Sequence, residues 1–355
     1  MAKTAIVTSS VFLAHDPGFS HVENSSRLEV VCDGLKSFAG RPEILFSEPE
    51  PATRADLLRV HSGEHIDRIG ATAGKPYDEL DADTITSARS YEAAVLAAGA
   101  VVGGARLVAA QEVANAFALV RPPGHHAEKG YAKGFCLFNN VAVAAAYALR
   151  ELGLKRVLIV DWDLHHGNGT QNSFYQTDQV LYFSTHMYPY YPGSGALQEQ
   201  GSGRGEGYNV NVPLSGGMND LAYATIFNDV LAPIARQYQP EMIMVSAGYD
   251  IYYGDPLGTM AVTEAGFAHL TRVVKNLATE LCGGRLLLTL EGGYSLTGLR
   301  DGVLASVGEL AGIPGSTELA GKIAALAEAG FGRPGCLPLA SLATLRRAYS
   351  GNWKI

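Results

Sequence analysis

The chain has 355 residues, of which 47% are hydrophobic and 17% are charged, a composition typical of a globular protein with a large core. Its net charge of −8 argues against general nucleic-acid binding, which needs basic patches that neutralise phosphate. No apolar run approaches the roughly 18 residues that a bilayer span requires. Residues 1–10 are typical of a first β-strand and not of a signal peptide. We therefore expect a cytoplasmic protein that binds neither nucleic acid nor membrane.

Short aliphatic runs predict strands that are buried on both faces, at residues 4–9, 116–120, 156–162, 180–186, 242–248 and 285–293. Helical stretches lie between several of them, at 90–111, 139–153 and 266–284. A further helix is indicated by an apolar stripe of Phe227, Val230, Leu231 and Ile234, and we expect Pro233 to kink or shorten it. Continuous apolar strands that alternate with helices predict an α/β fold with a mainly parallel sheet covered on both sides.

No internal repeat and no long linker divides the chain, so we expect one domain over 1–355. Its core spans about 4–312, and residues 313–355 form small helices and loops packed on it. Residues 193–207 are Gly-rich but lack the G-K-[ST] ending of a phosphate loop, which predicts a mobile surface loop. Reduced, buried thiols are expected for the four widely spaced cysteines, Cys32, Cys136, Cys282 and Cys336.

Carboxylates and an imidazole follow one of the buried strands. Asp161, Asp163 and His165 are alternate residues, so they share one face of an extended chain at the strand's carboxyl end, where ligands of open α/β sheets gather. Asp250 follows the strand at 242–248 and can complete a set of three ligands, the form that catalytic zinc sites take. Nitrogen and oxygen ligands also admit Fe(II), Co(II) or Mn(II). A hydrogen-bonded polar network without a metal is the alternative.

Two adjacent histidines, His125 and His126, follow a Pro-Pro-Gly turn and can both point into one pocket. A metal site that acts on a carbonyl needs a base for the water proton and a donor for the developing oxyanion. Asp161 and Asn168 are available to orient the two imidazoles, and Tyr294 can be the oxyanion donor. A capping or loop role is the alternative for the histidine pair.

The segments "RPPGHHA", "GFCLFNN", "DWDLHHGNGTQ", "SAGYDIYYGDPLG" and "EGGY" together resemble the zinc-dependent histone deacetylase family. That family includes acetylpolyamine amidohydrolases and acetoin-utilisation proteins. The matching segments run in family order from about residue 15 to 312, and Trp162 and Asn168 are similar to the class II and bacterial branch. The resemblance implies a single-domain, three-layer arginase–deacetylase fold and hydrolysis of an acyl-amide, commonly acetyl-lysine.

The resemblance also implies roles for individual residues. It implies a zinc site of Asp163, His165 and Asp250, a general base and acid at His126, an electrostatic partner at His125 backed by Asp161, and a transition-state donor at Tyr294. It implies one potassium site at Asp161, Asp163 and His165 with Ser184 and Thr185 nearby, and a second near Phe174, Thr177, Val180 and Tyr208. It implies substrate contacts at the tunnel aromatics Phe135 and Tyr191, at Gly134, Leu257 and Gly293, at the rim acid Asp83, and at Arg27 near the inner end of the pocket.

The sequence therefore predicts a metal-dependent lysine deacylase with one Zn²⁺ per chain, for which Fe²⁺ or Co²⁺ can substitute, and with bound K⁺. Neutral Asn168 behind His126 favours a neutral base at rest. Apolar Leu257 favours acyl-lysine over an acetylpolyamine. An acetylpolyamine amidohydrolase, a binuclear manganese hydrolase and a non-catalytic acyl-lysine binding module are the alternatives, and a homo-oligomer stays open.

Overall fold

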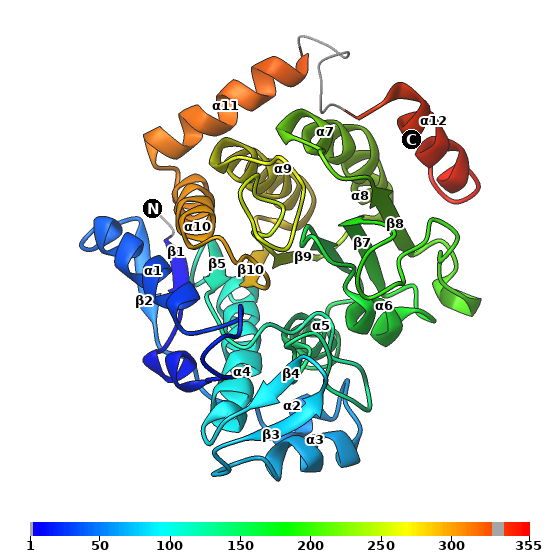
Figure 1. Cartoon of the computed structure of the whole chain (residues 1–355). Helices are drawn as coiled ribbons and strands as arrows, with labels where there is room; N and C mark the ends of the chain where they lie inside the picture. The colour runs from blue at the N-terminus through cyan, green and yellow to red at the C-terminus, as the bar shows by residue number, and fades with distance from the viewer. Residues whose placement is uncertain (1–2, 329–336) are drawn as a thin grey trace.

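The structure is a computed structural model that describes residues 3–328 and 337–355 (Figure 1). An eight-stranded sheet forms its middle layer, in the order β2-β1-β5-β10-β9-β6-β7-β8, and every pair of neighbours is parallel. The strands are β1 (Thr4–Val7), β2 (Ile44–Ser47), β5 (Asn115–Ala118), β6 (Val157–Asp161), β7 (Val180–Met187), β8 (Asn209–Leu214), β9 (Met242–Ala247) and β10 (Leu286–Leu290). The α/β fold with a central parallel sheet is confirmed.

The six predicted strands occupy the six inner positions of the sheet, and both edge strands were missed. Inner strands are buried on both faces and therefore read as continuous apolar runs. The edge strand β2 exposes Leu45 and Phe46. The other edge strand, β8, alternates polar and apolar residues and contains Pro213, which is typical of an edge.

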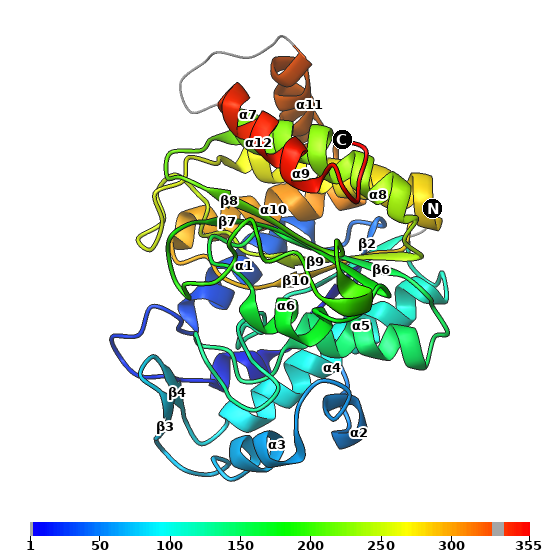
Figure 2. The same ribbon diagram turned by 90° about the vertical axis from the view of Figure 1, so that its right-hand side faces the viewer.

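Helices cover both faces of the sheet, which gives three layers (Figure 2). One face carries α4 (Ser90–Ala109), α5 (Asn140–Arg150) and α6 (Asn168–Phe174), which pack on β5, β6 and β7. The other face carries α9 (Glu264–Cys282) and α10 (Leu296–Ala311), which pack on β9, β10 and β1, with α1 (Ser26–Leu35) against α10. Beyond α4 lie α2 (Arg54–Leu57), α3 (Gly63–Gly70) and the antiparallel pair β3 (Asp78–Asp81) and β4 (Thr84–Thr86). Short 3-10 turns occur at Ser10–Ala14, Lys36–Phe38 and Gly203–Gly205.

The helix with the predicted apolar stripe is interrupted as expected. It consists of α7 (Asp220–Ile226), a π-helical turn at Phe227–Leu231 and α8 (Ala232–Tyr238). Pro233 lies in the first turn of α8, where its missing N–H and its ring exclude a regular bond to the preceding turn. The wider π turn accommodates this proline.

The C-terminal helices α11 (Pro314–Glu328) and α12 (Leu339–Tyr349) pack on the same domain. The helix α11 contacts α7, α9 and α10. The end of α12 lies against the open edge of β8, where the Tyr349 hydroxyl accepts from the Asn211 backbone N–H at 2.8 Å and donates to the Asn211 carbonyl at 2.7 Å. This contact satisfies backbone groups that an edge strand would otherwise leave unpaired.

One sequence expectation needs correction. The Gly-rich loop at 193–207 is packed and not a free surface loop, because the Glu199 carboxylate accepts from the backbone amides of Gly195 and Ala196 and from the Gln171 side chain.

Helix α4 has the length and composition of a membrane span, with a mean hydropathy of 1.5 over a window of 18 residues. Because 67% of this window is buried inside the domain, α4 is a core helix of the described structure.

The described cysteines are free thiols. Cys136 and Cys282 are buried and Cys32 is half-buried, whereas Cys336 lies outside the described residues. The expected free and buried thiol is therefore confirmed at Cys136 and Cys282, whereas Cys32 is free but less buried than predicted.

Candidate active site

The predicted site residues meet where four neighbouring strands end. In the sheet order β5, β10, β9, β6, each strand runs into one part of the site. The loop after β5 carries His125 and His126, and the turn after β10 carries Tyr294. Asp250 follows β9, and the cluster that begins at Asp161 follows β6. Because all four strands are parallel, their carboxyl ends converge at one edge of the sheet.

The three predicted metal ligands are buried and converge. Asp163, His165 and Asp250 offer ligand atoms that all lie within 4.8 Å of one another. The His165 Nδ1 atom is 3.2 Å from the Asp163 Oδ1 atom and 3.0 Å from the Asp250 Oδ2 atom. Ligand atoms about 2.0–2.2 Å from a tetrahedral centre are about 3.3 Å apart, so these separations fit a single divalent ion.

Backbone groups hold the two ligand carboxylates in place. The Gly292 amide donates to the Asp163 Oδ2 atom at 2.8 Å, and the Leu164 amide donates to the Asp250 Oδ1 atom at 2.8 Å. A Cβ atom at Gly292 would lie 2.4 Å from the Asp250 Oδ2 atom, so only glycine fits there. Burial and the neighbouring Asp163 carboxylate raise the pKa of Asp250 above its usual range. A bound cation would offset this repulsion, and so the donor set favours one.

Each histidine of the pair has its own acceptor, as predicted. The His125 Nδ1 atom is 3.1 Å from the Asp161 Oδ2 atom, and the His126 Nδ1 atom is 2.8 Å from the Asn168 Oδ1 atom. Although burial disfavours its charged form, Asp163 and Asp161 raise the pKa of His125 to about 10. Burial, together with the neighbouring His125 and His165, holds the pKa of His126 well below its usual range. His126 is therefore the neutral imidazole of the pair.

A narrow cavity of about 170 Å³ leads to these residues. It is lined by Asp83, Pro123, His125, His126, Gly134, Phe135, His165, Tyr191, Leu257, Gly292 and Tyr294. The predicted tunnel aromatics stand beside the catalytic groups, with ring centres 6.0 Å apart for Phe135 and Tyr294 and 5.1 Å apart for Tyr191 and His126. Five of the seven predicted substrate contacts line this cavity.

The other two predicted substrate contacts, Arg27 and Gly293, do not line the cavity. Arg27 is fully buried, donates to the carbonyl oxygens of Gly293 and Glu291 at 2.6 Å each, and lies 4.9 Å from the centre of the Tyr294 ring. It therefore supports the turn that carries Tyr294 from behind. The Arg27 guanidinium also donates to Glu23 at 2.8 Å, so three of its five N–H groups are bonded within the protein, and its contact with substrate stays a prediction.

The residues predicted for two potassium sites are brought close together in two groups. Asp161 and Ser184 are paired in the register of β6 and β7, and the Thr185 hydroxyl is 3.5 Å from the Asp161 carbonyl. The second group surrounds the loop between α6 and β7: Phe174 ends α6, Thr177 donates to its carbonyl at 3.2 Å, Val180 begins β7, and Tyr208 accepts from Tyr182 at 2.9 Å. Potassium binding at these groups stays a prediction.

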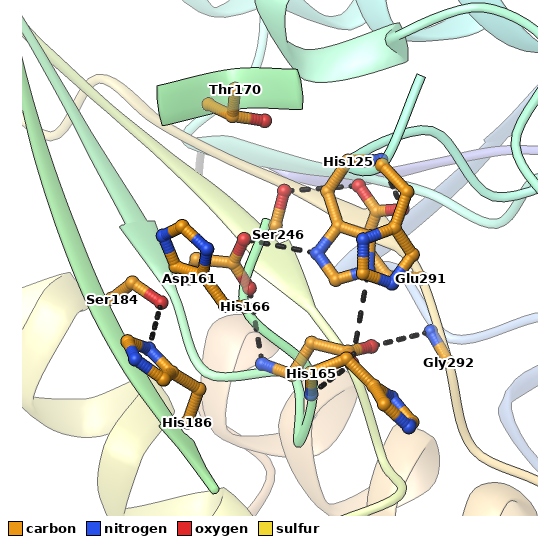
Figure 3. A network of polar contacts seen from close by, with 12 residues as sticks. His125, Asp161, His165, His166, Thr170, Ser184, His186, Ser246, Glu291 and Gly292 are labelled. Atoms are coloured by element: carbon orange, nitrogen blue, oxygen red, sulfur yellow. Dashed lines mark hydrogen bonds and ion pairs between the residues drawn. The ribbon is translucent and has the colours of Figure 1, made fainter. Parts of the chain in front are cut away.

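Sequence reasoning missed several carboxylates that support the site. Glu291 is fully buried, accepts from the amides of Gly124 and His125 at 2.7 and 3.1 Å, and accepts from the Ser246 hydroxyl at 2.9 Å (Figure 3). Burial raises the pKa of Glu291 to about 7. Asp255 accepts from the amide of Tyr294 at 2.7 Å. Both acids belong to segments quoted for the family resemblance, which is the signal that could have identified them.

A model of the histone deacetylase domain matches residues 21–310. The chain is 39% identical over 297 residues to a probable deacetylase of Archaeoglobus fulgidus, covering 83% of this chain and 82% of that protein. It is 44% identical over 306 residues to histone deacetylase 15 of Arabidopsis thaliana, covering 84% of this chain and 54% of that protein. The crystal structure of the HDA15 HD domain superposes with a TM-score of 0.85 at 38% identity, covering 99% and 98% of the two chains.

Other relatives differ in the substrate or compartment that their names state. Polyamine deacetylase HDAC10 of Danio rerio is 40% identical over 82% of this chain and 45% of that protein, and histone deacetylase 14 of Arabidopsis thaliana, 36% identical, is named as chloroplastic. All of these relatives are deacetylases, so they share one reaction class, the hydrolysis of amides. Because the domain model matches most of the chain and the relatives are 36–44% identical over most of its length, the chain belongs to the histone deacetylase family.

Proposed function

We propose that this protein removes acetyl or related acyl groups from the side-chain amine of lysine in peptides or proteins. The observation that carries the proposal is the cavity lined by Phe135, Tyr191 and His165, because His165 converges with Asp163 and Asp250 as a set of three metal ligands. The same cavity is lined by the neutral imidazole of His126 and by the phenol of Tyr294. A linear aliphatic stem fits between the two rings and brings its amide to these groups.

The residues divide the hydrolysis between them. A zinc ion held by Asp163, His165 and Asp250 would polarise the amide carbonyl and acidify a water, and Fe²⁺ or Co²⁺ would fit the same donors. The neutral His126 imidazole takes the proton of the attacking water and later gives it to the leaving amine. The Tyr294 hydroxyl donates a hydrogen bond to the carbonyl oxygen as negative charge develops there.

Lysine is favoured over a polyamine by the walls of the cavity. Leu257 lines it at a place where a cationic polyamine would call for an acid, and its apolar side chain instead suits an acyl-lysine stem. Asp83 lines the same cavity, and we propose that it holds the substrate backbone. The named polyamine deacetylase among the relatives makes an acetylpolyamine the second candidate substrate.

The test is a comparison of kcat/KM for an acetyl-lysine peptide and for acetylspermidine, with and without a chelator. We expect the peptide to be hydrolysed faster and both activities to be lost on chelation. A preference for acetylspermidine would replace the proposal by the polyamine alternative. A metal-loaded protein that hydrolyses neither substrate, nor longer acyl-lysine peptides, would favour the binding module.

Metal stoichiometry separates this proposal from a binuclear manganese hydrolase. Among the described residues, one group of three can hold a divalent ion, so we expect one equivalent per chain. Bound K⁺, a cytoplasmic location and a homo-oligomer remain expectations from the sequence.

A further inference from the structure

Glu128, two residues after the histidine pair, is a buried acid without a role in the proposed hydrolysis. Its side chain is only 7% exposed. The Glu128 Oε1 atom accepts from the side-chain Nδ2 atom of Asn168 at 2.6 Å and from the side-chain Nδ2 atom of Asn172 at 2.8 Å. The first of these contacts connects it to the catalytic machinery, because Asn168 is the residue that orients His126.

The backbone around Glu128 is fixed on both sides. Its amide donates to the Tyr131 carbonyl at 3.0 Å, and its carbonyl accepts from the His61 Nδ1 atom at 2.9 Å. The position of the His61 proton is defined by a backbone contact. Because the His61 Nε2 atom accepts from the backbone N–H of Asn139 at 2.9 Å, the ring proton must be on Nδ1. The backbone of Glu128 is thus held by contacts that do not involve Asn168.

An asparagine behind a catalytic histidine raises a problem of orientation. Its amide can present either the oxygen or the nitrogen to the imidazole, whereas a carboxylate presents oxygen both ways. Here the Asn168 Nδ2 atom donates to Glu128 at 2.6 Å and to the His126 carbonyl at 3.3 Å. This leaves the Asn168 Oδ1 atom to face the His126 Nδ1 atom. A flipped amide would place two acceptor oxygens against each other at the Glu128 contact.

The orientation of the Asn168 amide decides which His126 nitrogen is basic. With the amide oxygen at Nδ1, the His126 proton is on Nδ1 and Nε2 keeps its lone pair. With the amide nitrogen there, Nδ1 must accept, and the proton moves to Nε2. Since an Nε2–H group cannot take a proton from water, only the first orientation gives a competent base.

We propose that Glu128 is a positioning residue for His126, which holds the Asn168 amide in the one orientation that keeps the His126 Nε2 atom unprotonated and facing the cavity. The catalytic part of this inference rests on the proposed function of His126 as the base. The tautomer itself does not depend on that function and can be measured without substrate.

The first measurement is the tautomer of His126 by NMR of protein labelled with ¹⁵N-histidine, assigned with His126→Ala. We expect the proton on Nδ1 in the wild type and in Glu128→Gln, whose amide oxygen can still accept from Asn168. We expect a mixture of tautomers in Glu128→Ala. A wild-type His126 with its proton on Nε2 overturns the proposal, even if Glu128→Ala fails to fold.

The second measurement is a rescue. We expect Glu128→Ala to lower kcat by about 10- to 100-fold with KM within about twofold, and Asn172→Ala, the matched control, to stay near the wild type. Asn168→Asp should lower the activity of the wild type, because it places two carboxylates in contact. The same change should raise the activity of Glu128→Ala, because a carboxylate needs no fixed orientation.

This reversal is not expected of a merely structural Glu128. Wild-type kcat in Glu128→Ala, or no gain from Asn168→Asp in that background, overturns the inference. If His126→Ala retains activity while the tautomers behave as described, the assignment of His126 as the base fails and the positioning of its ring stands.

Discussion

We expect the free energy of unfolding to fall in acid because buried histidines are neutral in the folded protein. His61 is the histidine whose substitution tests this. Its ring is 2% exposed, its Nε2 atom accepts from the Asn139 amide, and its Nδ1 atom donates to the Glu128 carbonyl. Burial, followed by the neighbouring His65, lowers the pKa of His61 to about 3. A second proton on the ring would have to point at a backbone N–H, so protonation breaks this arrangement.

The sign and size of the effect follow from proton linkage. Because the folded-state pKa lies below the unfolded value of about 6.5, the unfolded chain binds more protons between those two values. The contribution of His61 to the free energy of unfolding is complete above pH 6.5 and is lost as the pH falls toward 3. At pH 4.5 the loss amounts to about 2.7 kcal/mol, from about 1.4 kcal/mol for each of two pH units.

The assay is urea unfolding of the wild type and of His61→Gln at pH 7.0 and pH 4.5. We expect the variant to be less stable at pH 7.0 by about 1–3 kcal/mol, because a buried hydrogen bond is lost. We expect it to lose about 2–3 kcal/mol less than the wild type on acidification. Loss of metal at low pH affects both proteins and cancels in the difference. Equal pH dependence in the two proteins would refute the reasoning.

Three further predictions concern the active site. Tyr294→Phe should lower kcat about 10²–10³-fold without a change in the free energy of unfolding, because Asp255 accepts from the backbone N–H of residue 294. Steady-state kinetics measure this, and near-normal turnover would contradict the role of Tyr294 as a donor. Gly134→Ala should destabilise the fold by about 1–2 kcal/mol, because the φ angle of Gly134 is +56°. It should also lower activity, because the added Cβ atom would lie 2.5 Å from the His126 ring. Thermal unfolding and turnover measure the two effects. Removal of the metal with a chelator should lower the unfolding temperature of the wild type but not that of Asp250→Asn, because the variant lacks a metal ligand. Calorimetry measures both temperatures. An equal fall in the two proteins would mean that the ion binds elsewhere.

How much of this could be predicted from the sequence depends on how local each signal is. The strands β5, β6, β9 and β10 are buried on both faces, so their apolar runs are visible without any knowledge of the partner. The edge strand β8 gives no such signal. Its Asn209 and Asn211 side chains both donate to the Gln171 side chain at 2.8 Å, a tertiary contact that no local pattern reports.

The residues of the active site also differ in whether a local sequence pattern predicts their position. Asp163, His165 and Asp250 each follow a predicted parallel strand, and the rule that ligands gather at carboxyl ends places them together. The supporting residues follow no such rule. Arg27 reaches the carbonyl of Gly293, which is 266 positions away in the chain, and its fully buried guanidinium becomes interpretable only when the turn behind Tyr294 is seen. The family resemblance placed Arg27 near the inner end of the pocket, but its contacts with this turn had no signal in the sequence.

The adjacent histidines illustrate how one residue type acquires two proton states. Their rings are 4.0 Å apart and similarly buried, so the difference between them must come from the groups that face each ring. The carboxylates of Asp163 and Asp161 favour the charged form of His125, whereas an amide, Asn168, accepts from His126 and leaves it neutral. The charge on the first ring lowers the pKa of the second further. Two loop residues with separate acceptors can therefore supply a fixed positive charge and a base within one pocket, which a single histidine cannot do.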